Sequence, residues 1–571
     1  MIKWEHPKGL MMLFFVEMWE RFSFYGMRAL LTLYLTLELF KNLQDPLKKS
    51  TAIGIYAAYG ALVYATPFIG GLIADKFLGH KKSVILGAVL MAVGHFVMAI
   101  ETQFWLYIAL AFLIMGNGFF KPNISSMIGG LYKDNDSRRD GGFTIFYMGI
   151  NLGAFLAPLI CGTIGEIYGW KYGFGIAGIG MMLGLLIFMR GKKSILNNGD
   201  VPNIQRLKKK ILNIIPLEYF IYFLSVVAVG FFALLVRYYE LMSYVLLPFS
   251  IAVIVILLVI AIRSNKQERE RMFVILILLF FTTLFWAFFE QAGSSLTLFA
   301  KENVDRFLFS KEIPASLFQS VNPLFILVLA PLFSMIWISM AKIKKEPSTP
   351  LKFMIGVFLL GIGFLILAYS PYSITFTALN IGQDDSAVII KAATVPMMFL
   401  VLSYLLQTMG ELCLSPIGLS MVTKLASKKI VAMVMGAWFL SSALAHHLGG
   451  AIANLTSESE QKNPVELVYE TLHSKLNTKQ IANWDESKDE LLMSASISGM
   501  QVVAENYNKQ NRNNTEMNLI NVDEACSVSV SILQKDPVFE AIAPVTVQKS
   551  LQIALSAEHF NMQKMERKLQ R

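Results

Sequence analysis

Four ionisable residues interrupt the first long apolar stretch of the chain: Glu17, Glu20, Arg21 and Arg28. Their spacing places them along one stripe of a helix, so that acidic and basic side chains come into contact. A charge at the centre of a lipid bilayer costs about 2.5–3.5 kcal/mol on insertion scales, and such residues therefore face a protein interior or an aqueous cavity. The stripe predicts a membrane helix that lines a polar pathway.

Three more ionisable residues stand alone in apolar stretches: Lys121, Glu290 and Glu411. An unpaired ammonium group in such a place is costly and tends to lose its proton, so Lys121 requires an acidic partner. We therefore expect charged side chains of different helices to meet inside the membrane.

The composition indicates a membrane protein. Of 571 residues, 55% are hydrophobic and only 16% are charged, and the mean hydropathy is +0.53, far from the balance of a soluble domain. The net charge of +10 comes from short basic clusters between apolar segments, which predicts membrane topology and no nucleic-acid partner. The three cysteines indicate neither a disulfide framework nor a metal site. The amino-terminal apolar stretch is too long for a signal-peptide core, so we expect a retained helix.

Thirteen segments are long enough to cross about 30 Å of hydrocarbon. They cover residues 10–37, 53–75, 83–101, 104–131, 143–165, 172–190, 217–237, 243–262, 272–293, 320–341, 353–370, 394–423 and 431–453.

The Lys and Arg residues between these segments predict their orientation. With the amino terminus in the cytoplasm, the inner segments hold 26 Lys and Arg and the outer segments hold 8. Because inner loops of membrane proteins are enriched in these residues, we expect a cytoplasmic amino terminus. We predict a multi-pass protein of a bacterial inner membrane, with the lipid bilayer as its surroundings.

The ionisable residues recur with a threefold period once the pair 217–262 is set aside, because they fall in the first, fourth, seventh and tenth of the remaining spans. Transporters of the major facilitator type are built from three-helix repeats within six-helix halves. We therefore expect an all-α polytopic protein with two six-helix halves and an extra helix pair between them. The predicted parts are 1–190 (first half), 191–271 (basic cytoplasmic loop and helix pair), 272–453 (second half, five recognisable spans) and 454–571 (polar tail).

Several sequence strings between residue 17 and about residue 450 resemble the proton-dependent oligopeptide transporter (POT/PTR) family of the major facilitator superfamily. The first is the ExxER signature with its aromatic run, from Glu17 to Gly26 and on to Arg28. The others are GALVYATPFIGGLIADKFLGHKK, GNGFFKPNISSMIG, FYMGINLGAFLAP, FWAFFEQAGSS, VNPLFILVLAPLF and MGELCLSPIGLSMVTKLA. One position departs from the family pattern, since Phe24 stands where the family usually has Tyr, and this puts a contact of that hydroxyl with substrate in doubt.

The resemblance implies roles for named residues in proton coupling. Glu17, Glu20 and Arg21 would form a salt-bridge switch with Lys121. Glu290 would bind the coupling proton, and Arg28 is the cation that could keep it ionised, because a carboxyl group in a cavity of low dielectric stays neutral unless a cation is near. Protonation of Glu290 would then free Arg28 and link proton binding to substrate binding.

The resemblance also implies a binding site for a zwitterionic peptide. Arg28 and Lys121 would hold its carboxylate, and Glu411, assisted by Asn322, would hold its ammonium group. Asn151 would bond the peptide backbone, and the remaining implied contacts are Tyr25, Tyr64, Trp286 and Trp438. Asp75, in the loop between the second and third spans, would act as a gate latch through charge-assisted hydrogen bonds. No cofactor is expected, with the proton as coupling ion, and no metal.

The resemblance implies a proton-coupled symporter that imports di- and tripeptides by alternating access. The alternatives are a carrier of the same family for another small anion or zwitterion, and a sensor or transport-impaired form. An enzyme is not expected, because the sequence contains no Walker loop, nucleophile elbow, paired metal ligands or soluble catalytic domain. The sequence leaves the preferred peptide, the proton stoichiometry and the oligomeric state open.

After residue 453 the chain becomes polar, and residues 454–571 contain no apolar window long enough to cross a bilayer. A complete facilitator has an even number of spans, so we expect that the final span is missing and that this tail is extracytoplasmic. The most apolar piece, VFEAIAPVTVQKSLQIAL, contains acidic and basic residues, which favours an amphipathic helix over a span.

Overall fold

A computed structural model of the chain describes residues 6–456, apart from 44, 133–135, 137, 196–198, 212–213, 310, 371–377, 381–387, 391–394 and 426–430. A helix covers each of the thirteen predicted segments. Such segments become helices because a bilayer offers no water to the backbone, and a helix satisfies its own N–H and C=O groups. The predicted tail and missing final span lie outside the described residues.

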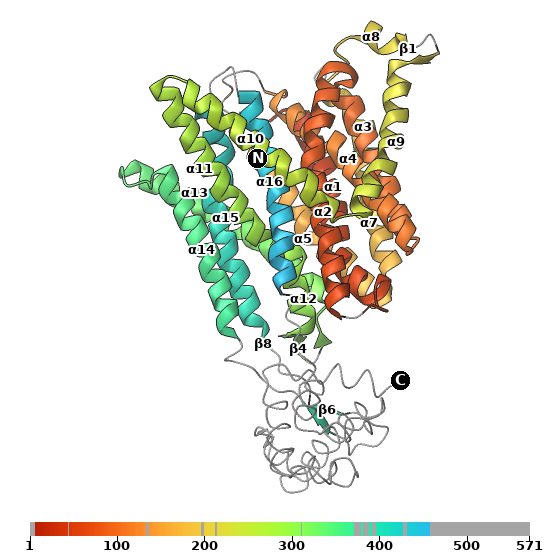
Figure 1. Cartoon of the computed structure of the whole chain (residues 1–571), viewed down its shortest axis with the longest axis vertical. Coiled ribbons are helices and arrows are strands. Elements are labelled where there is room, and N and C mark those ends of the chain that lie inside the picture. Colours follow the sequence, from red (N-terminus) through yellow and green to blue (C-terminus); the bar gives the residue numbers. More distant parts are fainter. Residues whose placement is uncertain are drawn as a thin grey trace, which may run out of the picture. The chain divides into compact units, whose positions relative to one another are not determined.

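The first half contains seven α-helices among the described residues, α1 to α7 (Figure 1). A turn of π-helix follows α1 at Leu35–Leu39, and another joins α5 to α6 at Pro158–Gly162. A third π-turn, Ala74–Leu78, separates α2 from α3. The helical conformation is interrupted between α6 and α7 at Gly169, which has a φ of 122°. The helices are α1 (Lys8–Tyr34), α2 (Asp45–Ile73), α3 (Gly79–Met98), α4 (Gln103–Gly129), α5 (Arg139–Ala157), α6 (Thr163–Tyr168) and α7 (Trp170–Gly191).

The second half contains five long helices, and a helix pair precedes it. The pair is α9 (Leu217–Arg237) and α10 (Leu241–Arg263). The second half comprises α11 (Lys266–Phe289), α13 (Val321–Lys342), α14 (Thr349–Tyr369), α15 (Met397–Leu425) and α16 (Val431–Leu455), with short α12 (Ser295–Glu302). The smaller elements are η4 (Lys192–Ile195), α8 (Ile204–Lys208), η5 (Glu290–Gly293), η6 (Ala315–Ser320), β1 (Lys210–Ile211), β2 (Ile215–Pro216), β3 (Val304–Asp305), β4 (Phe307–Leu308), β5 (Lys311–Glu312) and β8 (Val395–Pro396).

Short antiparallel strand pairs accompany the helices. In the main body, β1 pairs with β2, where Ile211 faces Ile215, and β4 pairs with β5, where Leu308 faces Lys311. A second unit, formed by residues 370–396 and 459–571, contains β6 (Ala378–Asn380) paired antiparallel with β7 (Val388–Ile390).

Helix packing links elements within each half and also across the halves, where α2 packs on α16 and α5 packs on α13. In the first half, α1 packs on α5 and α7, and α3 packs on α4 and α7. In the second half, α14 packs on α15, α13 packs on α15, and α11 packs on α16. The helix pair is shared, because α9 packs on α4 whereas α10 packs on α11 and α16.

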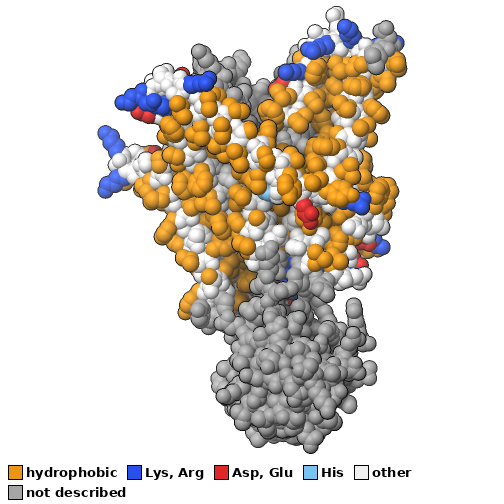
Figure 2. All heavy atoms as spheres, viewed as in Figure 1, with side chains coloured by type: hydrophobic (Ala, Val, Ile, Leu, Met, Phe, Trp, Pro, Cys, Tyr) orange, Lys and Arg blue, Asp and Glu red, His pale blue; other side chains and the backbone are white. Residues whose placement is uncertain are grey.

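Ten helical segments among the described residues are long and apolar enough to span a membrane. They omit α1, which carries the ionisable stripe, and α16, and they join α2 and α3 into the single segment Leu47–Met98. Figure 2 shows hydrophobic side chains over the flank of these helices, with Lys and Arg gathered where α8 and the α10–α11 turn lie. These two segments, both predicted to lie on one side of the membrane, are at the same end of the helices.

The two halves meet near their outer ends, where α1 finishes. Thr32 Oγ1 donates a hydrogen bond to the carbonyl oxygen of Gly293 at 2.6 Å, and Lys49 forms an ion pair with Glu302 at 2.5 Å. The carboxylate of Glu166 accepts hydrogen bonds from the backbone N–H groups of Ala315 and Ser316, at 3.2 and 2.8 Å. These contacts join the first half to the segment between α11 and α13.

Candidate functional site

The ExxER residues form a buried ion-pair cluster on α1. Arg21 Nε lies 3.3 Å from Glu17 Oε1, and the Arg21 guanidinium donates to both carboxylate oxygens of Glu20, in one case at 2.6 Å. Phe24 is buried, and its ring centroid lies 5.1 Å from Arg21 Cζ and 6.4 Å from the ring of Tyr59. The aromatic ring that replaces the family's usual Tyr therefore contacts the arginine of the cluster.

Lys121 lies beside an aromatic ring in this structure. Its Nζ lies 4.4 Å from the centroid of the Tyr64 ring, a cation–π distance, and it makes no ion pair with a carboxylate among the described residues. Arg21 engages Glu20 and Glu17 Oε1, and Glu17 Oε2 is buried without a hydrogen-bond partner in the described part of the chain. The expected switch between Lys121 and this cluster is therefore not made in this structure.

Arg28 and Glu290 form an ion pair between the two halves. Arg28 Nη2 lies 2.5 Å from Glu290 Oε2, and both side chains are nearly buried. Arg28 Nε also donates to Tyr56 Oη at 2.9 Å, and Arg28 Cζ lies 5.6 Å from the ring centroid of Tyr25. Glu290 follows the last residue of α11, where the helix tightens into η5. The cation near Glu290 in this structure is therefore Arg28, the residue that the sequence analysis named.

Glu411 and Asn322 form a second polar centre, within the second half. Asn322 Nδ2 lies 3.1 Å from Glu411 Oε2 and 2.9 Å from Thr408 Oγ1. Glu411 is buried on α15, and Asn322 lies in the first turn of α13. No ion pair with a described Lys or Arg neutralises this carboxylate, so it remains available to a cationic group.

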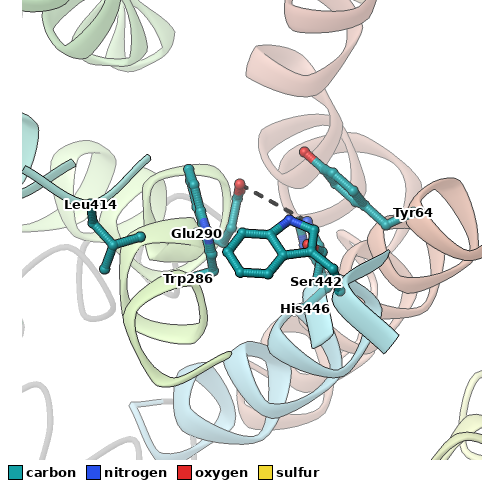
Figure 3. A pocket seen from close by; sticks show the side chains of 7 residues that line it. Tyr64, Trp286, Glu290, Leu414, Ser442 and His446 are labelled. Atoms are coloured by element: carbon teal, nitrogen blue, oxygen red, sulfur yellow. Dashed lines mark ion pairs between the residues drawn. The ribbon is translucent and has the colours of Figure 1, made fainter. Parts of the chain in front are cut away.

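A cavity of about 200 Å³ lies beside these charges (Figure 3). It brings together three predicted aromatic side chains, one from each of α2, α11 and α16, with the carboxyl group of Glu290. The lining residues are Tyr64, Trp286, Glu290, Leu414, Trp438, Ser442 and His446.

Asn151 and Asp75 complete the predicted set. Asn151 is buried on α5, and its Nδ2 donates to the carbonyl oxygen of Tyr147 at 3.0 Å. Asp75 is exposed, and its carboxylate lies 3.8 Å from His80 Nε2, so this contact becomes an ion pair only when His80 is protonated. Two neighbouring lysines anchor the loop instead: Lys81 pairs with Asp200 at 2.8 Å and Lys82 with Glu218 at 2.5 Å.

Among the residues at the site that were not predicted are His446, Ser442 and Tyr56. The helical spacing contains a signal for each of them, because residues four apart share one face. Trp438, Ser442 and His446 follow this spacing on α16, and all three line the cavity. Tyr56 lies eight residues before Tyr64 on α2.

Comparison with known proteins places the chain in a family. The family model of the POT family matches residues 81–516. The uncharacterized transporter YclF of Bacillus subtilis is 39% identical over 457 residues, which cover 79% of this chain and 88% of that protein. The peptide transporter YePEPT of Yersinia enterocolitica is 38% identical, with 78% and 87% covered. A di-/tripeptide transporter of Lactococcus lactis is 36% identical, with 78% and 89% covered.

Solved structures agree with this result. A crystal structure of a peptide transporter POT in complex with sulfate has a TM-score of 0.67 at 36% identity, with 79% of this chain and 89% of that chain covered. A POT family transporter in complex with 5-aminolevulinic acid has a TM-score of 0.67 at 35% identity, with 80% and 92% covered. The chain is a polytopic membrane protein that belongs to the POT family of transporters, not to a family of enzymes.

Proposed function

We propose that this chain is a proton-coupled symporter that imports di- and tripeptides by alternating access. The observation that carries the proposal is the ion pair between Arg28 and Glu290, because it joins a cation suited to a peptide carboxylate with a carboxyl group suited to a proton. Relatives that are named di-/tripeptide transporter and peptide transporter support the same substrate class.

The charged side chains suit the two ends of a peptide. Arg28 and Lys121 form the cationic pole for the carboxylate, and Glu411, held by Asn322, forms the anionic pole for the ammonium group. Such a pair of poles recognises what all small peptides share, and this explains how one site accepts many side chains. Asn151 and Tyr25 complete the polar contacts in this proposal, and Tyr64, Trp286 and Trp438 supply aromatic walls.

Proton coupling follows from competition for Arg28. While Glu290 is ionised, it holds Arg28 at 2.5 Å. A proton on Glu290 removes the negative charge, so Arg28 is released for the substrate carboxylate, and the binding of proton and peptide becomes linked. In the same proposal, the cluster of Glu17, Glu20 and Arg21 exchanges partners with Lys121 during the cycle.

The contacts between the halves suit a conformation that is closed on its outer side. Thr32 with Gly293, Lys49 with Glu302, and Glu166 with the start of η6 all lie near the outer ends of their helices. Because the bond between Arg28 and Glu290 also crosses the halves, its release weakens the closed state. The proton gradient thereby drives the alternation, with the proton as coupling ion and no resident cofactor in the proposal.

The experiment is uptake of labelled dialanine into liposomes that contain the purified chain, with and without an imposed pH gradient. We expect accumulation only with the gradient. Glu290→Gln should lose gradient-driven uptake by at least about tenfold more than it loses peptide counterflow, since counterflow needs no net proton movement. Glu270→Gln, on an exposed part of the same helix, is the matched control. Wild-type driven uptake by Glu290→Gln contradicts the proposed coupling.

A further inference from the structure

His446 is a buried histidine beside the coupling carboxylate. Its side chain is 7% exposed on α16, and its Nε2 lies 4.0 Å from Glu290 Oε1. Figure 3 shows this contact as a dashed line across the cavity that both residues line. At this distance a shift of about 1 Å brings the two atoms into hydrogen-bond range.

The two oxygens of Glu290 face different parts of the molecule. Oε2 pairs with Arg28 of α1, in the first half, whereas Oε1 faces His446 of α16. Helix α16 packs on α11, which positions Glu290, so the contact with His446 stays within the second half. Helix α16 also packs on α2 of the first half, whose Tyr64 ring stacks on His446.

The imidazole ring of His446 packs closely against two residues of α2. It stacks on the Tyr64 ring at 4.9 Å with an interplanar angle of 27°. Gly60, one turn before Tyr64 on α2, makes room for it, because a Cβ there would lie 2.5 Å from His446 Nδ1. Nδ1 is buried without a hydrogen-bond partner, so Nε2 is the ring atom that can serve Glu290.

The surrounding charges indicate which form the ring takes. Glu290 of α11 and Tyr64 of α2 face the imidazole directly, while Arg28 of α1 pairs with Glu290 and Lys121 of α4 lies over Tyr64. Burial and the two nearby cations disfavour a third positive charge on the ring, against the attraction of the Glu290 carboxylate. With its proton on Nε2, the ring can donate to Oε1 and leave only an acceptor unpaired at Nδ1.

We propose that His446 is a positioning residue of the coupling site, which holds the Glu290 carboxylate on its own half when the ion pair with Arg28 opens. The Nε2–H group donates to Oε1. The incoming proton forms its O–H bond at Oε2, the oxygen that Arg28 vacates, and His446 neither gains nor gives up a proton. This inference rests on the proposed role of Glu290 in coupling.

The test compares variants of His446 in proteoliposomes over a series of pH values. His446→Leu removes the donor, whereas His446→Gln keeps one. For His446→Leu we expect the midpoint of driven dialanine uptake to move by about one unit to higher pH, because the ionised form of Glu290 loses its donor. We also expect driven uptake to fall by about tenfold more than counterflow, and His446→Gln should recover most of both effects.

The matched control is His447→Leu. His447 is adjacent in sequence, but its Nε2 lies 3.2 Å from Ser243 Oγ of α10, away from Glu290, so its pH profile should equal that of the wild type. If His446→Leu does not fold, His446→Phe keeps the ring stacked on Tyr64 and is judged by the same criteria. The inference is overturned if a folded variant without the donor keeps the wild-type pH midpoint of driven uptake and the wild-type ratio of driven uptake to counterflow.

The background of Glu290→Gln separates this inference from the proposed function. If Glu290→Gln keeps driven uptake, the proposed coupling role fails. If Glu290→Gln loses it while His446→Leu behaves as wild type, only the positioning role fails. Counterflow stays measurable in Glu290→Gln, and adding His446→Leu to that background should leave the pH dependence of counterflow unchanged; a shift that appears there also overturns the positioning role.

Discussion

Gly70 of α2 packs directly against Gly118 of α4, so closely that a Cβ at position 70 would lie 2.0 Å from the Gly118 carbonyl oxygen. Because that atom belongs to the backbone, no side chain can move aside. We expect Gly70→Ala to push α2 from α4 and to lower stability by about 1–3 kcal/mol or more. The neighbouring Gly71→Ala places its Cβ 3.6 Å from Pro122 and should leave the melting temperature nearly unchanged. Equal melting temperatures for the two variants in detergent would contradict this packing.

Removal of either partner of the pair between Arg28 and Glu290 should have unequal effects on stability. Glu290→Gln leaves a buried guanidinium, which cannot lose its proton, whereas Arg28→Gln leaves a carboxylate, which can take one up. We therefore expect Glu290→Gln to be more destabilising at neutral pH, within the range of about 3–5 kcal/mol for a broken buried pair. As the pH falls, the deficit of Arg28→Gln should shrink first, because its lone carboxylate takes up a proton, and that of Glu290→Gln should shrink only where Glu290 of the wild type is itself protonated. Thermal unfolding of the wild type and both variants at several pH values measures how each stability deficit changes with pH.

Glu411 separates peptide transport from the transport of another small anion. Its carboxylate contacts Asn322 at 3.1 Å, and in our proposal it receives the peptide ammonium group. Glu411→Ala should reduce competition by peptides with a free amino group by at least about tenfold, as expected for a lost charge-assisted contact. Competition by N-blocked peptides should change much less. An equal loss for both kinds of peptide would argue against an ammonium site at Glu411.

The outer contact between Lys49 and Glu302 should separate during transport. The pair is partly exposed, so Lys49→Ala should cost at most about 1 kcal/mol of stability. A variant with cysteine at both positions, joined by a short thiol-specific cross-linker, should lose uptake because the outer side cannot open. Each single cysteine variant, treated in the same way, is the control. Uptake by the cross-linked protein would show that this contact persists through the cycle.

Helix positions could be predicted from the sequence because a long apolar segment in a bilayer forms a helix, which satisfies its own backbone N–H and C=O groups. The pairing of Arg28 with Glu290 was expected from the family resemblance, because the cost of a lone charge predicts that a partner exists but not which residue it is. The partner of Lys121 could not be predicted in this way, because Arg21 competes for the same carboxylates and only the packing places the Tyr64 ring beneath the ammonium group. His446 was missed because its relation to Glu290 depends on how α16 lies along α11.

The contacts of the loop that contains Asp75 could not be predicted from the sequence of that loop. The loop sequence indicates the superfamily, but which side chain anchors the loop depends on the segment from Asp200 to Glu218, which contacts Lys81 and Lys82. Spacing within one loop contains no information about that distant segment. The expected missing span and the role of residues 454–571 stay predictions.

The helix pair has a consequence for measurement. Since α9 lies against α4 and α10 against α11 and α16, each helix of the pair follows a different half, and their outer ends remain tied by the three residues from Tyr238 to Glu240. Spectroscopic labels at the inner ends of α9 and α10 would therefore report the opening angle of the transporter from its lipid-facing periphery. Such a pair of labels leaves every residue of the cavity unchanged, so the distance between the labels would measure opening without disturbing the binding site.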